Sequence, residues 1–393
     1  MGIEGLWKLV DAAQKKNTLP RLAIKDGFEE GSRGDRVYTI GVDVSIWEHQ
    51  LLNMPGARIR QAQRGENQEL WAFFGRLGAI SNIPVHLVFV ADGDLRPSIK
   101  RGTRVDPTKR WLERLMENFA RAFGFSWFEA VGEAEAELAV MNAMGRIDAV
   151  LTDDSDVLIF GAHTIIRNPA NFKPGLTSQV SVYRADAIRQ QVYITRGDML
   201  LYALLVGSDY DNKRGLPGCG TTIAAQLVQR GFGRKLHHAL LQHLTKTELT
   251  EFLEGWRADV RRVLITGASP LTRAQPGVAA NLTDTFPDLD IAHLLLSPTV
   301  SNPQRYASIT APQPMDIARI AQLCETHFAI GSSTGIVRTF RDKLWSAEVT
   351  RMLLAEGLAL INRPAKVLSS SSIRSCRWLT PRFSCAVSPS PPA

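Results

Sequence analysis

The sequence predicts an α/β fold in which a mostly parallel central sheet is flanked by helices. Three apolar runs are short and nearly uninterrupted, as in strands buried on both faces: residues 37–42, 85–91 and 147–151. Longer stretches with apolar residues at helical spacing lie between and after them, at residues 68–80, 108–123, 138–144 and 198–206. Strands that alternate with helices indicate crossover connections between parallel strands.

The totals are those of an ordinary globular protein with room for two or three domains. The chain has 393 residues, of which 45% are hydrophobic and 22% charged. A formal net charge of +7 suits a polyanionic partner. Four scattered cysteines without a Cys-x-x-Cys pair argue against a zinc site or a disulfide framework, and they predict a reducing compartment: Cys219, Cys324, Cys376 and Cys385.

The remaining segments give weaker signals. We expect a short helix at 6–10, a polar loop before residue 37, and helices at 221–229, 315–328 and 340–356. Short strands are predicted at 157–160, 164–167 and 180–183, and residues 257–303 are rich in turn formers. The first ten residues do not resemble a signal peptide, and no apolar run is long enough to cross a bilayer, so no membrane association is expected.

Acidic residues follow the ends of three predicted strands. Asp43 and Asp92 each end one, and Asp153-Asp154-Ser155-Asp156 follows the third. In an open α/β sheet, sites form outside the carboxyl ends of the strands. Glu133, Glu135 and Glu137 precede the third strand by one helix. In a regular helix Glu133 and Glu137 share a face, so Glu133 and Glu135 converge only if Glu133 lies in the loop or the first turn.

Carboxylates gathered in this way need cations among them. Two of them about 4 Å apart repel by roughly 4 kcal/mol at a partly solvated dielectric. A set of oxygen ligands without His or Cys suits Mg²⁺, with Mn²⁺ as a substitute. The alternative is a solvated acidic helix start, because glutamate is favoured in first turns.

Basic and glycine-rich segments flank the acidic residues. Lys100, Arg101, Arg104, Lys109 and Arg110 form either a solvated face or an arm over the acidic site. Arginines within residues 53–67 fit a DNA-facing loop or a solvated connection equally well. The turn at residues 215–220 precedes a predicted helix, so its backbone N–H groups could bind a phosphate. The alternative is a tight turn without a ligand.

Seven motifs occur in the order found in one nuclease superfamily. They are Gly2-Ile3-Glu4-Gly5-Leu6-Trp7, Gly41-Val42-Asp43, Phe89-Val90-Ala91-Asp92-Gly93, Gly132-Glu133-Ala134-Glu135-Ala136-Glu137, Thr152-Asp153-Asp154-Ser155-Asp156, Gly207-Ser208-Asp209-Tyr210 and the turn at 215–220. Together they resemble the XPG and flap endonuclease superfamily, over residues 1 to about 256, and within it the eukaryotic Gen/Yen-type Holliday-junction resolvases. A nucleotide-binding doubly wound domain is disfavoured, because no Gly-x-Gly-x-x-Gly turn follows the first strand.

The resemblance implies a PIN-like core and assigns roles to its residues. Two Mg²⁺ ions would be held by Asp43, Asp92, Glu133, Glu135, Asp154, Asp156 and Asp209, with Asp94 and Asp153 as bystanders. Lys100 would act at the scissile phosphate, with Arg104 as a second candidate. DNA would be bound by the basic arm and by a helix–two-turn–helix that often holds K⁺, through Arg101, Lys109, Arg110, Gly215, Gly218, Gly220, Thr221 and Thr222.

The same resemblance implies a domain organisation and a function. We expect a nuclease core at 1–206, a helix–two-turn–helix region at 207–256, a mainly helical accessory region at 257–366 and a disordered Ser/Pro-rich tail at 367–393. The expected function is Mg²⁺-dependent cutting of branched double-stranded DNA, four-way junctions and 5′ flaps, by a nuclear protein that is a monomer in solution and dimerises on four-way junctions. The alternatives are a strict 5′-flap endonuclease and a catalytically inactive DNA-binding protein of the same fold.

Three departures from the family pattern bear on substrate binding. Thr221 and Thr222 stand where the family often has a basic residue after the turn, which affects the phosphate grip. Ala91 precedes Asp92 where flap enzymes commonly carry an aromatic residue. No chromodomain is identified in residues 257–393, and its absence would affect junction binding more than phosphodiester chemistry.

Overall fold

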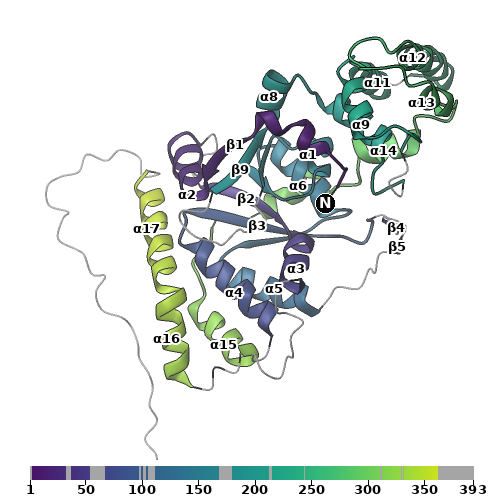
Figure 1. Cartoon of the computed structure of the whole chain (residues 1–393). Coiled ribbons are helices and arrows are strands. Elements are labelled where there is room, and N and C mark those ends of the chain that lie inside the picture. Colours follow the sequence, from purple (N-terminus) through teal and green to yellow (C-terminus); the bar gives the residue numbers. More distant parts are fainter. Residues whose placement is uncertain are drawn as a thin grey trace, which may run out of the picture.

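A seven-stranded sheet lies at the centre of the molecule (Figure 1). The computed structural model describes residues 2–31, 37–53, 67–96, 99–100, 103–104, 111–167, 179–211, 215–242, 244–309, 312–328, 330 and 332–361. In the order β1-β9-β8-β7-β2-β3-β6, the strands are β1 (Lys15–Thr18), β9 (Gln179–Arg184), β8 (Thr164–Arg167), β7 (Ala149–Leu151), β2 (Tyr38–Asp43), β3 (Val85–Ala91) and β6 (Ser126–Glu129). Pairing is parallel from β8 to β6, whereas β9 is antiparallel to both β8 and β1. The predicted α/β fold with a mostly parallel sheet is confirmed.

Helices cover both faces of this sheet. Successive residues of a strand point to opposite faces, so Val88 and Val90 of β3 join one core and Leu87 and Phe89 the other. The first core includes residues of α1 (Leu6–Leu9), α6 (Ala134–Ala143), α7 (Asp156–Phe160) and α9 (Arg196–Val206). The second includes residues of α2 (Leu19–Leu22), α3 (Val44–Leu52), α4 (Gln68–Ser81) and α5 (Trp111–Ala122).

An aromatic cluster in the second core fixes α3 on the sheet. Trp47 of α3 is 1% exposed, and its ring meets those of Phe73 and Phe89 edge-on, with centroids 6.1 and 5.4 Å apart. Such edge-to-face pairs contribute about 0.5–1.5 kcal/mol each beyond the area they bury. Since Asp43 is the residue that precedes α3, this packing also holds Asp43 in place.

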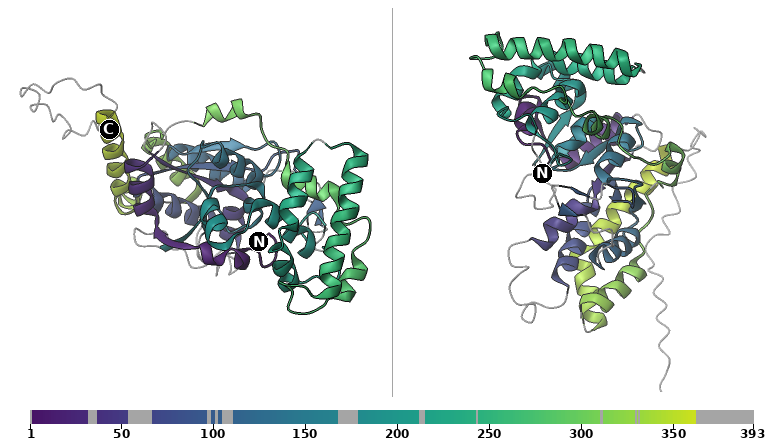
Figure 2. Two further views of the ribbon diagram at one scale, coloured as in Figure 1. Left: turned by 90° about the horizontal axis from the view of Figure 1, so that it is seen from above. Right: turned by 90° about the vertical axis from the view of Figure 1, so that its right-hand side faces the viewer.

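The C-terminal helices extend both cores. The helices α10 (Thr221–Val228), α11 (Phe232–Leu241), α12 (Lys246–Thr266), α13 (Pro276–Asn281) and α14 (Leu289–Leu296) continue the first core, and α15 (Ile317–Phe328), α16 (Ser333–Lys343) and α17 (Trp345–Ile361) pack on the second. Figure 2 shows these two groups at opposite ends of the molecule. The predicted boundary at residue 256 falls inside α12. The described part of residues 257–361 is mainly helical, and its helices are divided between the two cores.

Several local predictions are corrected. Residues 157–160 form α7 and not a strand, because an all-buried apolar run has no periodicity that separates the two and Gly161, at φ 96°, ends it as a helix. The predicted polar loop before residue 37 contains η1 (Asp11–Ala13), β1, α2 and the π-helical η2 (Ala23–Glu29). The predicted helix at 340–356 is two helices that meet at Leu344.

Short elements complete the described chain: β4 (Ile99–Lys100), β5 (Thr103–Arg104), α8 (Ala185–Ala187), η4 (Ile188–Val192) and η5 (Pro303–Ser308). The predicted tail at 367–393 and most of the arginine-containing segment at 53–67 lie outside the described residues.

Candidate metal centre and nucleic-acid interface

The carboxyl ends of three parallel strands bring acidic residues to one edge of the sheet. Asp43 is the last residue of β2, Asp92 follows β3 directly, and Asp154 comes shortly after β7. β2 lies between β3 and β7 and pairs with both, with Asp43 opposite Val90. Because neighbouring strands are about 4.8 Å apart, residues at these three strand ends share one small region.

Ser45 links two of these carboxylates. Its backbone N–H donates to Asp43 Oδ1 at 2.7 Å, and its hydroxyl donates to Asp92 Oδ2 at 3.1 Å. Asp92 Oδ1 in turn accepts from the backbone N–H of Ala134 at 2.9 Å, at the start of α6. Ser45 was not predicted from the sequence. A serine two residues after a strand-terminal aspartate that itself caps the following helix is the only signal for it.

The geometry of α6 answers the question about the three glutamates. Glu133 is the N-cap residue with an extended backbone (φ −83°, ψ 140°), and Glu135 lies in the first turn. Glu133 therefore precedes the regular helix, which is the condition under which it can converge with Glu135. The two side chains are 7% and 9% exposed.

Glu137 has a different role, because it holds a distant loop. Its side chain is 0% exposed, and its two carboxylate oxygens accept from the backbone N–H of Ser301 at 3.2 and 3.0 Å. Ser301 follows α14, so this contact attaches the C-terminal part of the chain to α6. Glu137 is a structural residue in this arrangement.

We expect Glu137→Ala to destabilise the fold without removing chemistry. Leaving the Ser301 N–H unpaired in a buried position costs about 1–3 kcal/mol, and the cavity adds to this. Urea denaturation measures the loss, and the cleavage rate per folded molecule should stay within about threefold of the wild-type rate. Glu135→Ala is the matched control. It should lose cleavage while its stability changes little. A stable but inactive Glu137→Ala variant contradicts this assignment.

The N-terminal segment lies against the third group of carboxylates. The backbone N–H of Ile3 donates to Ser155 Oγ at 2.8 Å and to Asp156 Oδ1 at 3.2 Å. Gly2 has a φ of 79°, and a Cβ added to it would lie 2.3 Å from Asp154 Oδ1 and 2.5 Å from Asp156 Oδ1. Asp154 and Asp156 are therefore neighbours, although Asp156 begins the helix α7 and does not lie in the extended backbone that their spacing suggested, and only glycine fits beside them.

Tyr210 connects the last predicted acid to the glutamates. Its hydroxyl donates a short hydrogen bond to Glu133 Oε2. Asp209, the preceding residue, is 2% exposed. The loop that carries both residues is tied by Asp211, whose carboxylate accepts from the backbone N–H groups of Ser208 and Gly215 at 2.7 and 3.0 Å. Neither Tyr210 nor Asp211 was assigned a role from the sequence.

We expect Tyr210→Phe to weaken metal binding. The tyrosine hydroxyl orients the Glu133 carboxylate, and loss of such a supporting hydrogen bond typically lowers metal affinity or activity by about 10–100-fold. The Mg²⁺ concentration for half-maximal cleavage should rise, and saturating Mg²⁺ should restore much of the rate. Tyr193→Phe, at an exposed ring, is the control. An unchanged Mg²⁺ requirement in Tyr210→Phe contradicts the orienting role.

Two arginines neutralise acids around the site. Arg96 Nη1 lies 3.1 Å from Asp92 Oδ2, a contact that the sequence analysis did not predict. Arg167 Nε lies 3.3 Å from Asp153 Oδ1 and its guanidinium stacks on Trp7, 4.6 Å from the ring centroid. Burial raises the pKa of the Asp153 carboxyl, and Arg167 opposes this shift. Asp153 is thus paired with Arg167. Asp94 is exposed to solvent.

The chemistry of the acidic residues fits hard divalent cations. Six of the seven predicted metal ligands are at most 9% exposed, namely Asp43, Glu133, Glu135, Asp154, Asp156 and Asp209. Buried carboxylates at one edge are stable together only with cations among them. Within the described residues, no group of three or more His, Cys, Asp and Glu side chains is arranged to hold a metal ion. Several of the oxygens instead accept hydrogen bonds from the protein, which ion binding would replace.

The basic arm is described only in part. β4 and β5 form a two-stranded antiparallel ribbon, with Lys100 opposite Thr103. Its backbone includes Lys100 and Arg104, whose side chains lie outside the described part of the chain, as do the whole of Arg101, Lys109 and Arg110. The alternatives for this arm therefore stay as the sequence left them.

The glycine-rich turn between α9 and α10 has the backbone that its sequence indicates. Gly215 and Gly218 have φ of 47° and 81°, and a Cβ on Gly215 would lie 2.4 Å from the carbonyl oxygen of Leu205. Gly220 is the N-cap residue of α10 and provides no side-chain cap for the N–H groups at this helix start. Thr221 is half-buried and Thr222 exposed there. This turn and the helix start that follows it are compatible with the helix–two-turn–helix that the sequence predicts.

Comparisons with known proteins point to one family. Residues 124–209 match the XPG I-region family. This part of the chain therefore carries an XPG I-region. It is 29% identical to the Flap endonuclease GEN homolog 1 of Mus musculus over 259 residues, which are 60% of this chain and 26% of that protein. The structure is similar to the eukaryotic junction-resolving enzyme GEN-1 binding with potassium (25% identity, TM-score 0.71, 91% of this chain and 79% of that chain).

A second solved structure extends the comparison. It is the Holliday junction-resolving enzyme GEN1 in complex with product DNA, Mg²⁺ and Mn²⁺ ions (25% identity, TM-score 0.69, 90% of this chain and 80% of that chain). The chain spans about a quarter of the length of the curated mouse relative. Among the described residues, none of the helices combines the length and the apolar character that a membrane span needs.

Proposed function

We propose that this chain is a Mg²⁺-dependent endonuclease that cuts branched double-stranded DNA near the branch point, in four-way junctions and 5′ flaps. The observation that carries the proposal is the meeting of carboxylates from the ends of β2, β3 and β7 and the start of α6 at one edge of the sheet, where all of them except Asp92 are buried. A helix–two-turn–helix follows the last of them in the chain. The similar proteins named above are a flap endonuclease and junction-resolving enzymes, one of the latter in complex with product DNA, Mg²⁺ and Mn²⁺.

Different residues have different roles in phosphodiester hydrolysis. The seven acids predicted as ligands would hold the ions, and two bound ions supply an activated water and stabilise the leaving oxygen. Ser45 positions the carboxylates of Asp43 and Asp92 by a hydrogen bond to each, and Tyr210 orients that of Glu133. Lys100, with Arg104 as the second candidate, offsets negative charge on the scissile phosphate. The turn at residues 215–220 and Thr221 and Thr222 bind a backbone phosphate, with K⁺ at the same turn.

A panel of labelled substrates tests the proposal. Flap, splayed-arm and four-way DNA are incubated with the full chain in Mg²⁺, in Mn²⁺ and in EDTA. We expect cutting near the branch point with either metal and none in EDTA. Paired symmetric nicks on the four-way substrate, made by two protomers of a protein that is monomeric alone, support a junction resolvase, and cutting of flaps alone supports a strict flap endonuclease. DNA binding without any cutting overturns the enzyme proposal in favour of a DNA-binding protein.

Affinity for DNA provides a second readout. Each phosphate neutralised by Lys or Arg should add about −0.9 to the slope of log K against log salt. A flat salt response contradicts a duplex-binding surface. A nuclear location belongs to the same proposal, and a fluorescent fusion of the full chain tests it.

A further inference from the structure

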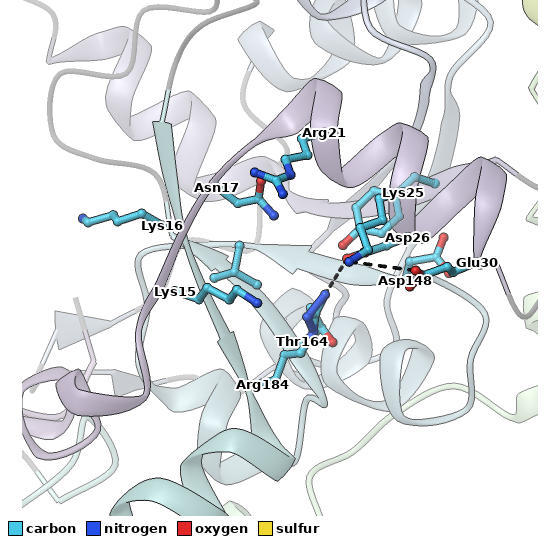
Figure 3. A pocket seen from close by; sticks show the side chains of 12 residues that line it. Lys15, Lys16, Asn17, Arg21, Lys25, Asp26, Glu30, Asp148, Thr164 and Arg184 are labelled. Atoms are coloured by element: carbon cyan, nitrogen blue, oxygen red, sulfur yellow. Dashed lines mark hydrogen bonds and ion pairs between the residues drawn. The ribbon is translucent and has the colours of Figure 1, made fainter.

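A second charged site lies at the opposite end of the sheet. A cavity of about 390 Å³ is lined by residues of β1, α2, η2, β8 and β9, together with Tyr38 and Asp148 (Figure 3). Tyr38 is the first residue of β2 and Asp43 the last. At about 3.3 Å per residue, their Cα atoms are roughly 17 Å apart. The cavity is therefore separate from the candidate metal centre.

The acids in this cavity are already engaged by the protein. Asp26 Oδ2 lies 2.5 Å from Arg184 Nη2, and Glu30 Oε1 lies 3.9 Å from Lys25 Nζ. Asp148 Oδ2 accepts from the backbone N–H of Thr39 at 2.6 Å. Figure 3 shows Asp26, Glu30 and Asp148 together on one side. Their negative charge is thus largely compensated within the protein.

The other side of the cavity has cations in excess. Lys15, Lys16 and Arg21 line it, and none of them forms an ion pair with a residue that the structure describes. Lys16 Nζ donates to the hydroxyl of Ser181 at 3.0 Å, a neutral partner. Lys15, Arg21 and Asn17 lie on the side away from the acids (Figure 3). This half of the cavity is suited to an anion.

A buried hydroxyl is the second, independent observation. Tyr38 is 2% exposed and lines the cavity, and its Oη has no hydrogen-bond partner among the described residues. Burial raises the pKa of Tyr38, and Asp26 and Asp148 raise it further, so its O–H keeps its proton and can donate. A buried donor without a partner is unfavourable unless something accepts from it.

Protection of an edge strand does not account for this arrangement. β1 is the outermost strand, and lysines on such a strand discourage pairing with other chains. Discouraging strand pairing does not require a buried tyrosine hydroxyl in the same cavity. Nor does it require the close packing of η2 on β2, where a Cβ added to Gly27 would lie 2.7 Å from Tyr38 Cβ.

We propose that this cavity binds a phosphate group, with Lys15 and Arg21 supplying the charge and Tyr38 a buried hydrogen bond. The phosphate belongs either to the backbone of a DNA arm or to a free phosphorylated molecule. In both cases the contacts are charge-assisted hydrogen bonds to phosphate oxygens. The site is separate from the metal centre. Its occupation by a DNA arm rests on the proposed function, whereas the binding of a free phosphorylated molecule does not.

Titration of the full chain with inorganic pyrophosphate in EDTA tests the site. The double variant Lys15→Glu, Arg21→Glu should bind at least about tenfold more weakly, and Tyr38→Phe about threefold to tenfold more weakly. Tyr38→Phe removes only an unpaired hydroxyl, so its unfolding midpoint should not fall, and weaker binding is not a folding defect. The charge-matched control is Arg338→Glu, Lys343→Glu on the exposed surface of α16.

Binding of a labelled four-way DNA in EDTA distinguishes the two sources of phosphate. If the double variant loses DNA affinity and its salt slope becomes shallower by about 0.9 per lost contact, the phosphate is that of a DNA arm. If only pyrophosphate binding falls, the ligand is a free phosphorylated molecule. Wild-type affinities of the variants for both probes overturn the proposal. An equal loss in the α16 control overturns it as well.

Discussion

Replacing Asp154 by alanine is expected to abolish cleavage while leaving DNA binding intact. The Asp154 side chain is 3% exposed, and its Oδ1 accepts from the backbone N–H of Asp156 at 3.0 Å, so it stands at the centre of the third carboxylate group. A bound metal ion contributes several kcal/mol of charge stabilisation, and each 1.36 kcal/mol is a factor of ten. Loss of an ion ligand should therefore slow cutting on the order of 10³-fold or more.

The measurement is single-turnover cleavage of a 5′-flap or four-way DNA in Mg²⁺, with binding followed by fluorescence anisotropy in EDTA. Asp94→Ala is the matched control, because this carboxylate follows the same strand as Asp92 but is exposed to solvent. It should cut at close to the wild-type rate. An Asp154→Ala protein that retains a tenth of the activity contradicts the metal-centre assignment.

Replacing Gly2 by alanine is expected to slow cleavage by about 10²-fold, which is the cost that a misplacement of roughly 1 Å can impose on a reaction. The added Cβ would lie 2.3 to 2.5 Å from Asp154 Oδ1, Ser155 Oγ and Asp156 Oδ1, and a φ of 79° disfavours any L side chain. Either the N-terminal segment or the two carboxylates must shift. Both shifts disturb the same ion-binding region.

Gly145→Ala separates contact from backbone strain. Gly145 also has a positive φ, 68°, but a Cβ there meets nothing within 4 Å. This variant should lose about 1–2 kcal/mol of stability and keep its cleavage rate. Single-turnover rates and thermal unfolding of both variants are compared at equal folded fraction. If Gly2→Ala cuts as fast as the wild type, the N-terminal segment does not constrain the acidic residues.

Strongly patterned segments were predictable from the residues alone. The buried strands β2, β3 and β7 are short apolar runs, and an aspartate at or after each end marks the functional edge of a parallel sheet. The polar strand β1, Lys15–Thr18, carried no such signal, because an edge strand with one solvated face needs little apolar content. For the same reason the cavity behind it was not predicted.

Contacts between distant segments were not predictable in this way. Gly2 meets Asp154 and Asp156, Tyr210 reaches Glu133, and Glu137 holds Ser301. Each joins residues that are far apart in the chain, so no local pattern encodes the partner. The predicted boundary at residue 256 falls inside α12 for a related reason. The composition changes there, but α12 continues because its buried face packs on α11 and α13.

The sequence by itself determined the sheet, the strand-terminal aspartates and the order of motifs that resembles one nuclease superfamily, because hydrophobic periodicity and spacing are local properties. Only the tertiary structure decided which loop Glu137 holds, which glycine must lie against the carboxylates, and where a second excess of positive charge gathers. These depend on burial and on the distance between side chains, and both arise only when the chain has folded.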